Sequence, residues 1–94
     1  MYNMGKCGAR IKDLRNSRKI TQEALAGKLY ISRDHLRRVE TGKKGASIDL
    51  LIDIAELFDV SLDYLICGKT YENEHMKRDL SIAINMLTEI VKKL

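Results

Sequence analysis

The stretch YISRDHLRRVETGKK, residues 30–44, carries few apolar side chains for a segment with helical spacing. Only Ile31, Leu36 and Val39 are firmly apolar, and five Lys or Arg side chains surround them. An ordinary surface helix mixes charges of both signs more evenly. The segment is therefore expected to hold one face against the protein and to present the other to something negatively charged.

The whole chain has 94 residues, enough for one domain with a modest core. Apolar residues make up 45% of it, mostly Leu, Ile and Ala, and Pro is absent, so a globular, all-helical protein is expected. No run approaches the roughly 18 apolar residues that span a membrane. The first residues lack the apolar segment of a signal peptide. A cytoplasmic protein without membrane contact is therefore expected.

The charge is distributed unevenly along the chain. Residues 1–45 hold twelve Lys or Arg against four Asp or Glu, a net of +8. Residues 46–94 hold five against nine, a net of −4. Such asymmetry suggests that one face meets a polyanion. Composition alone supports equally a polar molecule without such a partner.

Enzymatic and metal chemistry find little support in the sequence. The two cysteines and two histidines, Cys7, Cys67, His35 and His75, show no metal-ligand spacing, so neither a metal nor a cofactor is expected. The cysteines are expected to be free thiols. No Ser, Cys or His has a second catalytic group at a diagnostic spacing, and a chain this small has little room for a closed pocket.

Helix start and stop signals predict five short helices within a domain of residues 8–68. The expected helices are residues 8–19, 22–29, 33–40, 48–58 and 62–66. Four of them follow a Ser or Thr that can cap a helix, namely Thr21, Ser32, Ser47 and Ser61. Gly42 and Gly68 lie where helices are expected to end. In the second helix, Ala24, Leu25 and Leu29 are predicted to face inward.

A polar linker, residues 69–73, is expected to precede a longer amphipathic helix, residues 74–94. Its apolar residues step by four and three in the pattern of a heptad seam: Met76, Leu80, Ala83, Leu87, Ile90 and Leu94. Ile84 and Val91 widen this seam on one side and Met86 on the other. An isolated helix is marginal in water, so the seam needs a partner surface. Pairing with a second copy is the favoured reading, and packing onto its own domain is the alternative.

Two short helices joined by a tight turn, the second of them basic, form a helix-turn-helix. The segments RIKDLRNSRKITQEALAGKLYISRDHLRRVETGKK and SIDLLIDIAELFDVSLDYL resemble the Cro and phage-repressor type of helix-turn-helix, the XRE family. The resemblance covers residues 8–68. It rests on the TQ-x-x-LA start, the Ser that opens the recognition helix, the Glu-x-Gly at its end and the VSLDYL helix. It implies an all-α, five-helix, lambda-repressor-like DNA-binding domain, followed here by the C-terminal amphipathic helix.

The resemblance also assigns roles in DNA binding. It implies that Arg33, Asp34 and Arg38 face base edges, with His35 and Arg37 more peripheral. Arg can bond guanine in bidentate fashion, and Asp can accept from cytosine. The alternative for each arginine is contact with phosphate alone. For Asp34 the alternative is that it orients the two arginines three and four residues further on.

The remaining roles concern the ends of the recognition helix, residues 32–40. The resemblance implies that Gln22 touches phosphate and braces this helix, and that Ser32 caps it or reaches phosphate. Lys43 and Lys44 match a phosphate-binding loop, and Arg15 and Glu40 match a structural ion pair. The XRE family usually has Gly where this chain has Tyr30, so either Tyr30 accepts a left-handed turn or the turn geometry differs.

The leading hypothesis is a sequence-specific, DNA-binding transcription regulator of the repressor kind. It would bind an inverted-repeat operator in double-stranded DNA as a homodimer. The alternative is an antitoxin-like protein-interaction module whose C-terminal helix binds an unlike protein partner.

Overall fold

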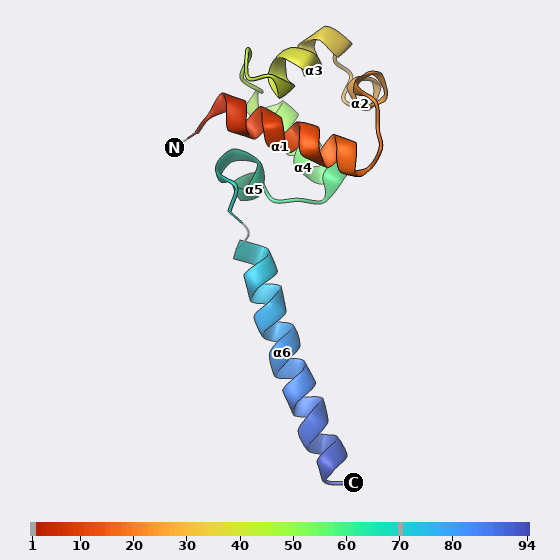
Figure 1. Ribbon diagram of the computed structural model, residues 1–94, viewed down its shortest axis with the longest axis vertical. Coiled ribbons are helices and arrows are strands. Elements are labelled where there is room, and N and C mark those ends of the chain that lie inside the picture. The colour runs from red at the N-terminus through yellow and green to blue at the C-terminus, as the bar shows by residue number, and fades with distance from the viewer. Residues whose placement is uncertain (1, 70) are drawn as a thin grey trace.

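The computed structural model describes residues 2–69 and 71–94, and the side chains among them outside residues 71–79. All regular structure in this part of the chain is helical, as predicted. The helices are α1 Met4–Ser17, α2 Gln22–Lys28, α3 Arg33–Glu40, α4 Ile48–Phe58, α5 Leu62–Cys67 and α6 Tyr71–Lys92. The first five form a small bundle, and α6 extends away from it (Figure 1).

The predicted caps set the starts of α2 to α5. The hydroxyl oxygens of Thr21, Ser32, Ser47 and Ser61 each accept a hydrogen bond from the backbone N–H three residues further on, at 3.0–3.1 Å. Each therefore satisfies one of the orphan donors of a helix N-terminus. Gly42 and Gly68, just past α3 and α5, have φ angles of 76° and 74° and confirm the predicted helix ends.

Two helices begin earlier than predicted. α1 starts at Met4 rather than near residue 8 because the Asn3 side chain accepts from the Lys6 backbone N–H at 2.9 Å and caps it. α1 ends at Ser17, before Lys19, whose φ of 57° leaves the helical region. α6 starts at Tyr71, inside the predicted linker. The predicted linker holds one glutamate, Glu72, and neither Gly nor Pro, which suits a first helical turn.

The core is built from one face of each of the first five helices. Burial of Leu25, Leu29, Leu36 and Val39 confirms the inward faces predicted for α2 and α3, but Ala24 is exposed and its place is taken by Ala26. The buried apolar residues of the described part are Cys7, Ile11, Leu25, Ala26, Leu29, Leu36, Val39, Leu50, Leu51, Ile54, Ala55, Phe58 and Leu65.

The two cysteines differ in their surroundings. Cys7 is buried in the core and Cys67 is exposed, and both are free thiols. Burial raises the pKa of the Cys7 thiol, against a smaller opposing effect of the Arg10 charge. Cys7 therefore stays protonated and packs as a small apolar side chain.

α1 and α3 cross with their backbones almost in contact. A Cβ atom on Gly8 of α1 would lie 2.1 Å from the carbonyl oxygen of Val39 and 2.7 Å from that of Glu40. A Cβ on Gly42, just after α3, would lie 2.6 Å from Cα of Gly5. These separations admit no side chain, so the glycines fix how closely the end of α3 approaches α1.

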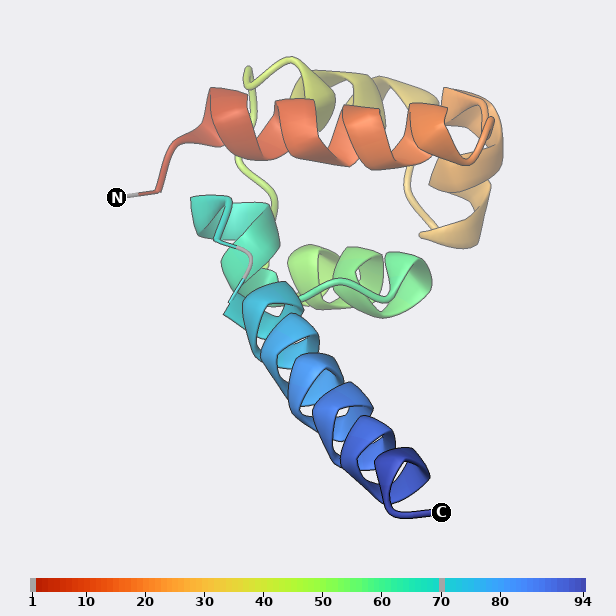
Figure 2. The ribbon, with the colours of Figure 1, turned by 60° about the horizontal axis from the view of Figure 1, so that its bottom comes forward.

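α6 projects from the side of the bundle opposite α3 (Figures 1 and 2). All side chains from Leu80 to Leu94 are exposed, so this stretch does not pack onto its own domain as the alternative reading required. The first residue of the predicted seam, Met76, has its side chain outside the described residues. None of the helices in the described ranges combines the length and apolarity of a membrane span.

Two glycines inside helices provide a matched test of the α1–α3 crossing. Gly8→Ala is expected to lower the free energy of unfolding by about 1–3 kcal/mol, because the methyl group forces the two backbones apart. Gly27→Ala is expected to raise it by about 0.5–1 kcal/mol, because no atom lies within 4 Å of the added Cβ. Urea unfolding followed by circular dichroism measures both, and equal effects of the two substitutions would refute the steric argument.

Candidate nucleic-acid interface

α3 has two faces of opposite character. Leu36, Val39 and Glu40 are buried against the bundle. Arg33, Arg37 and Arg38, together with the loop lysines Lys43 and Lys44, are exposed. The structure thus brings the predicted DNA-contacting cations to the exposed face of one helix and the loop that follows it.

Glu40 anchors the buried side of α3 to two other helices. Its Oε2 accepts from Nε of Arg15 at 2.7 Å, and its Oε1 accepts from the second guanidinium nitrogen of Arg15 at 3.1 Å. The same Oε1 accepts from Nε2 of Gln22 at 3.0 Å. Arg15 also donates to the carbonyl oxygen of Ile20 at 2.9 Å. The end of α3 is therefore bonded to α1 and to the first residue of α2.

The partner of Gln22 was not foreseen from the sequence. The resemblance implies that this side chain braces the recognition helix, and the structure supplies the atom that it reaches, a carboxylate oxygen of Glu40. The amide nitrogen of Gln22 already donates one N–H to Glu40. The amide oxygen of Gln22 is an acceptor and cannot form a hydrogen bond with a phosphate oxygen. Any phosphate contact here falls to the second N–H of the amide or to backbone N–H groups at the start of α2.

Asp34 lies on the exposed face and bonds both arginines of its own helix. One carboxylate oxygen accepts from Arg37 at 2.6 Å and the other lies 3.1 Å from Nε of Arg38. In this geometry Asp34 orients Arg37 and Arg38, which is one of the two roles that the sequence leaves open for it. The hydrogen bond from Arg37 is the main cause of a lowered pKa at Asp34. As the pH falls through that pKa, the carboxylate is neutralised and both arginines are released.

The residues that flank α3 are held mainly by backbone hydrogen bonds. The Ser32 hydroxyl oxygen accepts from the backbone N–H of His35 at 3.0 Å, so Ser32 caps the helix. The backbone N–H groups of Lys43 and Lys44 both donate to the carbonyl oxygen of Arg38, at 2.9 and 3.2 Å. This tight turn keeps both lysine side chains beside the end of α3.

Tyr30 occupies the turn between α2 and α3 in a left-handed conformation, with φ of 57°. The turn therefore keeps the geometry that usually calls for Gly. The Tyr30 side chain is 96% exposed, so it meets no packing conflict. A left-handed backbone is uncommon for a bulky residue, and the turn carries some strain.

Two further cations of the basic half, Arg10 and Arg18, have structural roles that sequence analysis missed. Arg10 donates to the carbonyl oxygens of Leu65 and Ile66, at 2.9 and 3.3 Å, at the end of α5. Arg18 donates to the carbonyl oxygen of Phe58 at 2.8 Å and lies 5.3 Å from the centroid of its ring. With Arg15, they bond α1 to the ends of α5, α4 and α3. Part of the +8 charge is thus used inside the protein.

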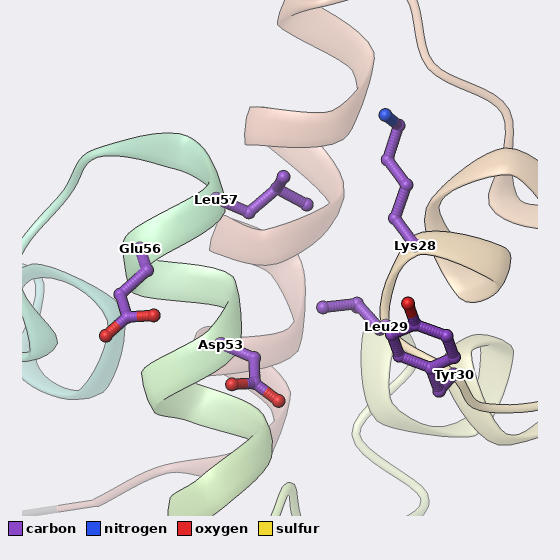
Figure 3. Close-up of a pocket in the computed structure, with 6 residues that line it drawn as sticks. All are labelled: Lys28, Leu29, Tyr30, Asp53, Glu56 and Leu57. Carbon is purple, nitrogen blue, oxygen red and sulfur yellow. The ribbon is translucent and has the colours of Figure 1, made fainter.

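An open groove lies between the end of α2 and α4 (Figure 3). It is lined by Lys28, Leu29, Tyr30, Asp53, Glu56 and Leu57. No Ser, Cys or His lines it, so the groove offers no nucleophile with an adjacent base.

Together, the capped helix pair, the locked inner face of α3 and its cationic outer face define a helix-turn-helix domain. A family model described as Helix-turn-helix matches residues 11–65, more than half of the chain. The chain belongs to this XRE-type helix-turn-helix family of DNA-binding transcription regulators, as the sequence predicts.

The chain is similar to known regulators and repressors. An uncharacterized HTH-type transcriptional regulator of Bacillus subtilis, YqaE, is 39% identical over 66% of this chain and 53% of its own length. The restriction-modification controller protein C.AhdI of Aeromonas hydrophila matches with a TM-score of 0.62 and 27% identity, over 67% of this chain and 96% of that chain. The P22 c2 repressor, solved with a synthetic operator, matches with a TM-score of 0.63, 27% identity and the same coverage.

These similarities bear out a lambda-repressor-like fold for the bundle. The chain spans about half the length of the curated relative from Bacillus subtilis. The curated relatives that match this chain are HTH-type transcription regulators.

Removal of the Glu40 carboxylate tests its anchoring role. Glu40→Ala is expected to lower the free energy of unfolding by about 3–5 kcal/mol, because it leaves the buried Arg15 guanidinium without its counter-charge. The double variant Arg15→Met, Glu40→Leu is expected to lose much less, because neither charge is then buried alone. Urea unfolding of both variants gives the comparison, and a double variant as unstable as Glu40→Ala would contradict the pairing argument.

Proposed function

We propose that this protein is a transcription repressor that binds an inverted-repeat operator in double-stranded DNA as a homodimer. α3 is its recognition helix and α6 its dimerisation helix. The DNA-binding domain is then the predicted residues 8–68 with the start of α1 from Met4, and the pairing segment is the predicted residues 74–94 on α6. The protein is proposed to act in the cytoplasm, without a cofactor and without enzymatic activity.

The fixed orientation of α3 carries this proposal. Its buried side is determined by Leu36, Val39 and the Glu40 network, so its cations can only point away from the bundle. A basic helix with one face locked and the other open suits insertion into the major groove. The nearby Lys43 and Lys44 are placed for the phosphates that border the groove.

Among the exposed cations, Arg33 is the best candidate for reading a base. It is the first residue of α3, where the side chains of a recognition helix meet base edges. Arg37 and Arg38 share the Asp34 carboxylate, which restricts their geometry. They must exchange that carboxylate for phosphate or a base edge when DNA binds.

Dimerisation is proposed from the exposed apolar face of α6. Its described seam residues are Leu80, Ala83, Leu87, Ile90 and Leu94, flanked by Ile84 and Val91. All are exposed in the single chain, and paired helices would remove them from water. α3 lies on the far side of the bundle, so pairing through α6 leaves it free (Figure 2). The same exposure supports the antitoxin-like alternative, in which an unlike protein covers α6.

The function is tested by selecting duplexes from a randomised library with the full chain. Selected sequences are expected to be two-fold symmetric, with half-site centres about 10 bp apart if the dimer spans one turn of DNA. Fluorescence anisotropy should then show binding at least about a thousandfold tighter than to a scrambled duplex. Equal affinity for the two duplexes would overturn sequence-specific recognition.

Two substitutions separate base reading from phosphate contact. Arg33→Ala is expected to weaken binding to the selected site by about 1–3 kcal/mol and to relax the preference at one base pair. Lys43→Ala is expected to weaken selected and scrambled duplexes equally and to reduce the slope of log affinity against log salt by about 1. A uniform loss for Arg33→Ala would assign this arginine to phosphate instead.

A further inference from the structure

The apolar face of α6 is wider than a pair of helices covers. In the heptad, the described a residues are Leu80, Leu87 and Leu94, and the described d residues are Ala83 and Ile90; Met76 also lies at a d position. The neighbouring e positions carry Ile84 and Val91, and one g position carries Met86. In two-stranded coiled coils the e and g positions are commonly charged and face water. Here these three side chains are 60–67% exposed and would stay largely exposed in a pair.

The residue types within the seam point the same way. Ile or Val at a with Leu at d favours two strands, whereas Leu at a with Ile at d shifts the preference to three or four. α6 has Leu at every described a position and Ile90 at one of its d positions. The other d residue whose side chain is described, Ala83, is small, and the longer Ile84 and Met86 border it. At the level of Ala83, the large apolar side chains are therefore those of the flanking residues, Ile84 and Met86. Further helices would pack against these flanks.

A groove marks one of these flanks. It is lined by Ile84, Leu87, Thr88, Val91 and Lys92. Its first four residues have the spacing of the four-residue hole that receives a side chain from a facing helix. Because Ile84, Thr88 and Val91 lie beside the seam, the helix that fills this hole is not the one that covers the seam. Met86, on the opposite flank of a neighbouring copy, is a flexible apolar side chain that suits such a hole.

The area available to a pair is small. A buried Leu, Ile or Met side chain removes on the order of 100 Å² from water. The four large described seam residues, Leu80, Leu87, Ile90 and Leu94, therefore supply about 400 Å² per chain, half of the roughly 800 Å² of a standard interface. Adding the flank residues Ile84, Met86 and Val91 brings the sum to about 700 Å² per chain.

We propose that four copies of this chain assemble through α6, with the seam joining copies in pairs and the flanks joining the two pairs. The inference rests on the proposed pairing through α6 and extends it. α3 lies on the side of the bundle away from α6, so all four recognition helices stay accessible (Figures 1 and 2). The assembly carries two pairs of recognition helices and holds two DNA duplexes at once.

Lysine substitutions at three neighbouring positions test the assembly. Ile84→Lys places a charge on the flank, Leu87→Lys places it in the seam, and Asn85→Lys, the matched control, places it on the outer face. Multi-angle light scattering is carried out on each full chain over a wide range of concentrations. The expected masses are about four times the 10.8 kDa chain mass for the native chain and Asn85→Lys, twice for Ile84→Lys, and once for Leu87→Lys.

Each other outcome overturns a defined part of the argument. A native chain at twice the chain mass overturns the four-copy assembly and leaves the proposed homodimer standing. A native chain at the chain mass overturns both and favours an unlike partner on α6. If Ile84→Lys keeps the native mass, the flank has no role in assembly and the proposal fails.

A bridging experiment tests the consequence for DNA. A biotinylated random-sequence duplex on beads is incubated at low salt with the protein and a fluorescein-labelled copy of the same duplex. The native chain and Asn85→Lys are expected to retain the fluorescent duplex. Ile84→Lys is expected to bind the beads without retaining it. Retention by Ile84→Lys equal to that of the native chain, or no retention by the native chain, would refute the claim that four copies hold two duplexes.

Discussion

The buried carboxylate of Glu40 is the interaction on which the cationic face depends. A carboxylate away from water is tolerated only when its oxygens are paired, and here Arg15 and Gln22 pair both of them. Those donors come from the end of α1 and the start of α2. Both carboxylate oxygens are paired only when α3 keeps this orientation relative to α1 and α2. The contact of Gly8 with the carbonyl of Val39 sets the distance. A polar network and a steric limit thus hold a helix that buries few apolar side chains.

The basic half of the chain contains cations of two kinds. Arg10 and Arg15 on α1, and Arg18 just after it, donate to carbonyl or carboxylate oxygens at the ends of α5, α3 and α4. Their hydrogen bonds satisfy oxygens at helix ends and link the helices, so these charges stabilise the fold. The exposed cations of α3 and its following loop have no such structural function. Two of them, Arg37 and Arg38, are held by Asp34, whose exposed ion pairs contribute little to stability but restrict where the arginines point.

Much of this could be predicted from the sequence because the signals are local. A capping residue such as Ser32 or Thr21 can be recognised from its residue type and its position before a helix. The inward-facing Leu36 and Val39 can be recognised from their spacing. The roles of Arg10 and Arg18 could not, because their carbonyl partners lie forty or more residues away. The reading of Asp34 stayed open for a different reason. Ion pairing and base contact use the same carboxylate, and residue type and spacing fit both; in the free protein this carboxylate pairs with Arg37 and Arg38.

The small surface that one domain offers to DNA gives a physical reason for the exposed apolar face of α6. One small domain offers a single short helix and a few lysines to DNA, and such a surface binds weakly at physiological salt. Linking two domains makes the second contact intramolecular and raises the effective concentration without any new contact. A helix whose apolar residues stay in water has no stabilising function in the single chain. The exposed apolar face of α6 is therefore the feature on which the proposed pairing of these small domains rests.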